Sequence, residues 1–135
     1  DVPAFRRMMW FVIVTYTAAT VVYFLYPTQQ LLRPEVFARD NALTRAVAWF
    51  YTFDTNTNVC PSLHVIGSAA ALFALRDCPR LRKRAWQAAS VILALCISLS
   101  TVFMKQHSVL DVLYALPVCA LGWWLCYGRT RRRSR

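Results

Sequence analysis

Uncharged, largely apolar windows alternate with charged segments along the 135-residue chain. The windows lack Asp, Glu, Lys and Arg, and they cover residues 8–32, 55–75, 85–104 and 112–128. Each is close to the ~20 apolar residues that a helix needs to cross a bilayer, although the second offers only about 17 and would stand nearly upright. The pattern predicts four membrane-spanning helices, at about residues 8–26, 59–75, 86–104 and 108–128.

The segment between the first two windows contains one amphipathic stretch. Leu43, Val47 and Phe50 recur at steps of three and four residues, the spacing of one helix face. Several neighbouring residues are aromatic and suit the boundary between headgroups and acyl chains. We predict a helix at about residues 41–53 that lies on the bilayer as a connector, with a lip that binds a specific lipid as the alternative.

Composition supports the membrane assignment. Hydrophobic residues make up 58% of the chain, against roughly 45–50% in soluble domains. A soluble bundle of four such helices would leave almost nothing to face water. We therefore expect an all-α fold, an integral membrane helical bundle of four transmembrane helices that forms a single domain over residues 1–135.

The net charge of +10 is distributed unevenly. Twelve of the sixteen Lys and Arg residues fall in the amino-terminal arm, in the loop after the second window and in the tail "RTRRRSR". Four crossings put these three segments on one side, and cytoplasmic loops are the ones enriched in basic residues. We predict a bacterial inner membrane, cytoplasmic termini, a tail that touches anionic lipid and no nucleic-acid partner.

Polar residues gather at the helix ends that this topology places on the opposite, outer face. They form the stretches "YPTQQLLRP" (26–34), "PSLH" (61–64) and "STVFMKQHSVLD" (100–111). Because charge distribution and polar clustering are independent features, their agreement predicts a site on the membrane surface that faces the periplasm or exterior.

The third stretch places His107 and Asp111 one helical turn apart at the head of the last span. A carboxylate at that depth is costly unless it is paired. A hydrogen bond to one imidazole nitrogen of His107 would explain it and would leave the other nitrogen free to attack. His64 is then suited to protonate a leaving oxygen. The alternative is a structural His–Asp bond that only anchors the helix end.

Residue types suited to phosphate binding lie in the same three stretches. Arg33 and Lys105 supply positive charge, and Ser62 with the backbone N–H groups at the start of the second span supplies donors at a helix amino terminus. This combination predicts a phosphate site.

The same residues resemble the three signature motifs of the type 2 phosphatidic acid phosphatase (PAP2) superfamily, which includes vanadium haloperoxidases. "RP" follows the first span, "PSLH" opens the second, and His107 with Asp111 opens the last. The match looks like a bacterial membrane-bound branch. The resemblance implies that His107 is a nucleophile forming a phosphohistidine, that Asp111 orients it, and that His64 is the general acid. It also implies phosphate binding by Arg33 and Ser62, the catalytic core of the haloperoxidase-like fold, and no cofactor or metal.

The chain departs from the family pattern at three positions. Tyr26 stands where a lysine is usual, Thr101 where an arginine is usual, and Leu63 where a glycine is usual. Two phosphate-binding cations are thus missing, and we hypothesise that Lys105 replaces one. Similar losses occur in relatives such as inositol phosphorylceramide synthases, which transfer a phosphorylated headgroup.

We therefore expect a membrane lipid phosphatase that hydrolyses a phosphate monoester or diphosphate of a phospholipid or prenyl lipid. The first alternative is a transferase of phosphorylated headgroups. Others are a metal-dependent hydrolase with His64, His107 and Asp111 as ligands, and a non-enzymatic scaffold. Family members commonly carry two helices ahead of these four. We expect either that those two leading helices have been removed or that this is a minimal form that works with a partner chain or as a homo-oligomer.

Overall fold

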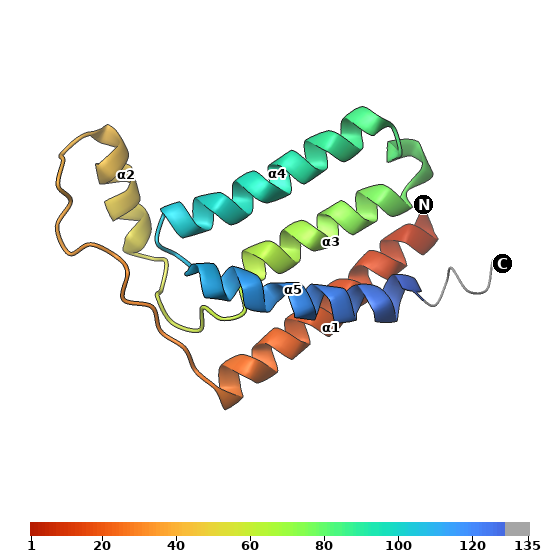
Figure 1. Ribbon diagram of the computed structural model, residues 1–135, viewed down its shortest axis with the longest axis horizontal. Coiled ribbons are helices and arrows are strands. Elements are labelled where there is room, and N and C mark those ends of the chain that lie inside the picture. Colours follow the sequence, from red (N-terminus) through yellow and green to blue (C-terminus); the bar gives the residue numbers. More distant parts are fainter. Residues whose placement is uncertain (129–135) are drawn as a thin grey trace.

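The computed structural model describes residues 1–128, and every regular element in that range is a helix (Figure 1). Five α-helices follow one another: α1 Val2–Leu25, α2 Ala42–Tyr51, α3 Leu63–Asp77, α4 Arg84–Phe103 and α5 Val109–Trp123. A short 3₁₀ turn (η1, Pro79–Leu81) joins α3 to α4, and a π-helical turn (η2, Trp124–Gly128) continues α5. The fold is all-α as expected, and the basic tail predicted to anchor on lipid lies outside the described residues.

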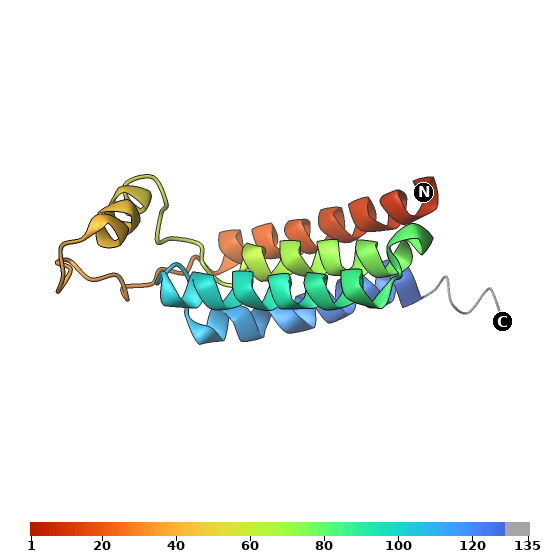
Figure 2. The same cartoon turned by 90° about the horizontal axis from the view of Figure 1, so that it is seen from above.

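Four helices form the bundle and one stands apart. Helices α1, α3, α4 and α5 run side by side, with α3 packed against the other three (Figures 1 and 2). Helix α2 lies beyond one end of the bundle, and the N-terminus lies at the opposite end, where α5 also finishes (Figure 1). Successive bundle helices alternate in direction, so the connection between α3 and α4, which is rich in Arg and Lys, lies at the end opposite α2 (Figure 1).

Three helices are long and apolar enough to cross a membrane: Val2–Leu25, Arg84–Phe103 and Val109–Gly128. Helix α3 has 15 residues and is therefore only ~22 Å long at ~1.5 Å per residue, short of a ~30 Å hydrocarbon core. The structure thus supports a membrane protein with three candidate spans, and it does not confirm the fourth.

Two helix boundaries differ from the sequence prediction for local reasons. Helix α1 begins at Val2, six residues before the predicted start, because the Asp1 side chain accepts the Ala4 N–H and Pro3 fits the first turn. Helix α3 begins at Leu63, because Ser62 is still extended, with ψ at 114°. Helix α2 lies within the predicted amphipathic stretch, and its position on the bilayer remains a prediction.

The bundle core is narrow, and its outer faces are apolar. Phe11, Ile66 and Ala115, from α1, α3 and α5, are fully buried. Gly122 lets α1 approach α5, because a Cβ there would lie 2.4 Å from Thr15 Cγ2. Large apolar side chains on the outside remain exposed, among them Trp10, Ile92, Leu93, Leu99 and Leu113. Such surfaces suit contact with the apolar acyl chains of a bilayer, where the helices also satisfy their own backbone hydrogen bonds.

Candidate active site

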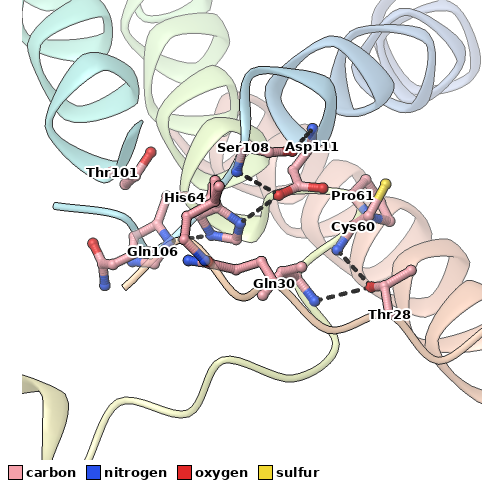
Figure 3. A network of polar contacts seen from close by, with 12 residues as sticks. Thr28, Gln30, Cys60, Pro61, His64, Thr101, Gln106, Ser108 and Asp111 are labelled. Carbon is pink, nitrogen blue, oxygen red and sulfur yellow. Dashed lines mark hydrogen bonds and ion pairs between the residues drawn. The ribbon is translucent and has the colours of Figure 1, made fainter. Parts of the chain in front are cut away.

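His107 lies in the turn between α4 and α5, and this turn is at the end of the bundle near α2 (Figure 1). Figure 3 shows polar residues that gather there, among them His64, Gln106 and Asp111. The Thr101 carbonyl accepts the backbone N–H groups of Gln106 at 2.9 Å and His107 at 3.2 Å. Lys105 adopts a positive φ of 54°, a conformation that costs energy for a residue other than glycine. The side-chain amide of buried Gln30 donates to the Lys105 carbonyl and holds this turn from the α1–α2 connector.

The two histidines of the chain meet there. His64 lies in the first turn of α3, and its Nδ1 is 3.2 Å from His107 Nε2. The rings meet edge to face, with centroids 5.3 Å apart. His107 is only 7% exposed, whereas His64 is an exposed residue. The pair therefore joins a buried imidazole to one that substrate can reach.

Asp111 lies on the other side of His107. Its Oδ2 is 3.8 Å from His107 Nδ1, close enough for an ion pair but longer than the hydrogen bond expected from the sequence. The same Oδ2 accepts the Ser108 N–H at 2.7 Å, while Ser108 Oγ accepts the Asp111 N–H at 3.3 Å. This reciprocal capping box starts α5 and fixes the carboxylate beside His107.

Burial lowers the pKa of His107 below its ordinary value, and the neighbouring His64 lowers it further, while Asp111 acts in the opposite direction. His107 is therefore neutral near pH 7. Since Nδ1 faces the carboxylate, the tautomer that Asp111 favours carries its proton there. The Nε2 lone pair then points toward His64.

Ser62 lies at the junction of α3 and α5. It is fully buried, its N–H donates to the Asp111 carbonyl at 3.1 Å, and its hydroxyl has no hydrogen-bond partner within residues 1–128. Tyr23 from α1 donates its phenol to the Pro61 carbonyl at 2.6 Å and holds the segment before α3. An unpaired buried hydroxyl at a helix amino terminus has the donor capacity that a phosphate oxygen needs.

Arg33 forms no hydrogen bond or ion pair with either histidine in the described part of the chain. Its Nη2 lies 2.5 Å from Asp54 Oδ2, its Nη1 donates to the Asp54 carbonyl, and its guanidinium stacks on Tyr51 at 4.5 Å. Asp54 Oδ2 also accepts the Gln106 side-chain amide at 3.3 Å. Arg33 is thus linked to the residue before His107 through one carboxylate.

A cavity of about 400 Å³ lies beside the Arg33–Asp54 pair. It is lined by Arg33 and by residues 51–57.

The remaining predicted site residues are placed less favourably. Lys105 is exposed and offers its backbone carbonyl to the network. Tyr26 ends α1 and is 73% exposed. Thr101 is buried, but its hydroxyl donates to the Ser98 carbonyl within α4. Thr101 therefore stabilises the turn through its carbonyl. Neither Tyr26 nor Thr101 offers a positive charge where the family usually has one.

A family model described as the PAP2 superfamily matches residues 7–135. The chain belongs to the PAP2 superfamily. This confirms the resemblance to the PAP2 superfamily drawn from the three motifs. Superfamily members are generally phosphatases or phosphotransferases, and a PAP2 phosphatase acts on lipid phosphates in a membrane. No curated protein and no solved structure matches the chain.

The sequence prediction missed two polar residues of this candidate site, Asp54 and Gln30. Asp54 lies in "DTNTN", whose composition is typical of turns. It is nevertheless the one acidic residue between Asp40 and Asp111 on the predicted outer side. That isolation was the sequence feature that could have identified Asp54 as a site residue. Gln30 is 6% exposed, and nothing in the sequence distinguishes it from Gln29.

The metal-site alternative finds no ready ligand cluster. Over residues 1–128, no group of three His, Cys, Asp or Glu residues is arranged to hold a metal ion. The nitrogens of His64 and His107 instead face each other.

Proposed function

We propose that this PAP2 chain cleaves or transfers a lipid phosphate, with His107 as the nucleophile. The observation that supports the proposal best is the order Asp111, His107, His64, with 3.8 Å between the first two groups and 3.2 Å between the imidazoles. A carboxylate on one nitrogen and an accessible acid beside the other is the arrangement that nucleophilic catalysis by histidine requires.

The reaction follows in two steps. His107 Nε2 attacks phosphorus, the N–P bond forms and the bond from phosphorus to the lipid oxygen breaks, while His64 delivers a proton to the departing alcohol. Water or an acceptor hydroxyl then attacks the phosphohistidine, His64 removes its proton, and His107 is released. Asp111 stabilises the positive charge that the imidazole ring gains between the two steps.

The cradle for the phosphate oxygens lies beside this pair. The unpartnered Ser62 hydroxyl and the amino terminus of α3 supply donors, and Arg33 supplies a fixed charge nearby. The two imidazoles stand too close for phosphorus to lie between them, so the exposed His64 ring moves aside when substrate enters. Geometry of this kind tightens around substrate in many enzymes.

The second candidate is a transferase that moves a phosphorylated headgroup between lipids. It is favoured by the shortage of cations: Tyr26 is turned to solvent, the Thr101 hydroxyl is engaged within α4, and Arg33 is already paired. A phosphodiester carries less charge to neutralise than a phosphate monoester. In both cases we propose that the site faces the periplasm or exterior of a bacterial inner membrane.

The test is an assay of the purified chain in lipid nanodiscs against phosphatidate, a prenyl diphosphate and inositol- or glycerol-headgroup phospholipids, with and without an acceptor alcohol. Phosphate release identifies a phosphatase, and headgroup movement that requires the acceptor identifies a transferase. His107→Ala must abolish either activity without changing the melting temperature. Full turnover in that variant would show that the nucleophile lies elsewhere.

A further inference from the structure

The two terminal nitrogens of the Arg33 guanidinium are already bound by the protein, while its buried Nε has no partner within residues 1–128. The side chains of Arg33 and Asp54 are 14% and 25% exposed, and their charged atoms approach to 2.5 Å. A second Arg33 nitrogen donates to the Asp54 backbone carbonyl, and Tyr51 covers one face of the guanidinium. Such a pair is stronger than an ordinary surface salt bridge, because little water screens it. Any phosphate that reaches for Arg33 competes with Asp54.

The Asp54 carboxylate also acts on the catalytic side of the site. It accepts the Gln106 side-chain amide at 3.3 Å, and the backbone N–H groups of Gln106 and His107 share the Thr101 carbonyl. Burial dominates the pKa of His107 and lowers it, and among the weaker influences Asp54 acts to raise it. The negative charge of Asp54 is therefore felt at the nucleophile.

Charges in and around the site nearly balance. Arg33 and Lys105 are the cations, and Asp54 and Asp111 are the carboxylates. A phosphate monoester brings about −1.5 to −2 charges at pH 7, whereas a phosphodiester brings one. The carboxylate of Asp54 repels the first more strongly than the second, and partial burial enhances that difference.

A cavity lies beside the Arg33–Asp54 pair. The cavity of about 400 Å³ is lined by Arg33 and by the segment 51–57, which is rich in Thr, Asn and Asp. Its size is within the range of small-molecule sites. A bare phosphate monoester has nothing to place there, whereas the headgroup of a phosphodiester lipid does.

We propose that Asp54 determines the substrate class, by occupying Arg33 so that the site disfavours phosphate monoesters and accepts lipids with a singly charged phosphodiester headgroup. The proposal rests on the proposed function. His107 would bond to the phosphorus that bears the headgroup, the lipid alcohol would leave with the proton from His64, and an acceptor hydroxyl or water would take the phosphorylated headgroup.

Equilibrium binding of two soluble probes tests this without turnover. Inorganic phosphate at pH 8 is largely a dianion, and dimethyl phosphate is a monoanion. Each can be titrated into the full chain, which carries isotope-labelled histidine and is held in micelles, and binding is followed by the NMR signals of the histidines. Asp54→Asn keeps an oxygen for Arg33 and removes the charge. We expect it to shift the preference toward phosphate over dimethyl phosphate by roughly tenfold, the order of effect of one partly buried charge.

Asp40→Asn is the matched control. Asp40 pairs with Arg45 at 3.5 Å with both side chains more than 70% exposed, so the variant makes the same change of net charge at a surface ion pair and should leave the preference unaltered. Asp54→Ser provides a second neutral variant should the asparagine form fold poorly. The double variant Arg33→Gln, Asp54→Asn should show no shift in the preference for phosphate, because it has no guanidinium for the loss of the Asp54 charge to release.

The proposal is overturned if neutral residues at position 54 leave the preference unchanged, weaken both probes alike, or fail to bind phosphate more tightly than the wild type. It is overturned equally if the shift survives Arg33→Gln or appears in Asp40→Asn. These outcomes are independent of the proposed function, because loss of turnover in His107→Ala supports that function whichever probe the site prefers.

Discussion

Asp111→Asn isolates the electrostatic role of the carboxylate beside His107. The substituted amide oxygen can still accept the Ser108 N–H that starts α5, so the helix cap persists while the charge is lost. Asp111 does not face the substrate side of the ring, because its Oδ2 lies 3.8 Å from Nδ1 whereas Nε2 faces His64. The variant should therefore change turnover and leave KM almost unaltered.

The expected size of the effect follows from the distance. Two unit charges 3.8 Å apart interact by about 4 kcal/mol at an effective dielectric constant of ~20, which suits groups as buried as these. The imidazole gains between about half and all of a positive charge as the N–P bond forms, so the barrier should rise by about 2–4 kcal/mol. Turnover should fall by roughly 30-fold to 1000-fold.

The assay is kcat on the preferred lipid, combined with the rate of phosphoenzyme formation in a single turnover. Ser108→Ala is the structural control: it removes the hydroxyl that accepts the Asp111 N–H, at a cost of about 1 kcal/mol of stability, and keeps the carboxylate. It should lower the melting temperature and leave kcat within a few-fold. If Asp111→Asn keeps kcat within threefold of the wild type, or both variants slow turnover equally, the electrostatic argument fails.

Three further predictions follow from the same structure. Because His64 helps to lower the pKa of His107, His64→Asn should raise that pKa, and the signal of the one remaining histidine in an NMR titration reports the direction; an unchanged or lower pKa refutes the coupling. Gly122→Ala places a methyl group 2.4 Å from an α1 side chain and should destabilise the bundle by about 1–3 kcal/mol in thermal unfolding, whereas Gly128→Ala meets nothing nearer than 3.5 Å and should be neutral; equal effects contradict the packing. Lys105→Met removes an exposed cation and should weaken phosphate binding and lower kcat/KM by a few-fold if Lys105 replaces a missing family cation, a hypothesis that unchanged kinetics would eliminate.

Local chemistry explains which parts of the site could be predicted from sequence. The spacing of four residues predicted His107 and Asp111 one turn apart on a helix. In the structure α5 begins only at Val109, after His107, and the capping box of Ser108 and Asp111 holds the carboxylate 3.8 Å from His107. The charge pattern likewise predicts which helix ends share one side, and the structure places those ends together (Figure 1). Such inferences use only neighbouring residues or a count of crossings.

What escaped prediction depends on contacts between distant segments. Arg33 finds Asp54 21 positions away, and Gln30 reaches Lys105 across 75 positions. Neither pairing has a periodicity or a local spacing that would reveal it. The length of α3 is a related case: the apolar window continues back to residue 55, but the extended Ser62 delays the helix to Leu63. Uncharged composition alone therefore overestimated the second span.

The position of Asp111 combines stability with function. A carboxylate in the first turn of a largely apolar helix is tolerable because it caps that helix, accepting the Ser108 N–H and benefiting from the helix dipole. The same oxygen faces His107, and the Asp111 carbonyl accepts the Ser62 N–H at the start of α3. One residue thus lies beside the proposed nucleophile and joins the two helix starts that form the proposed phosphate cradle. Because the same contacts stabilise the start of α5, the proposed nucleophile is held beside the carboxylate before substrate arrives, and little reorganisation is left for the chemical step.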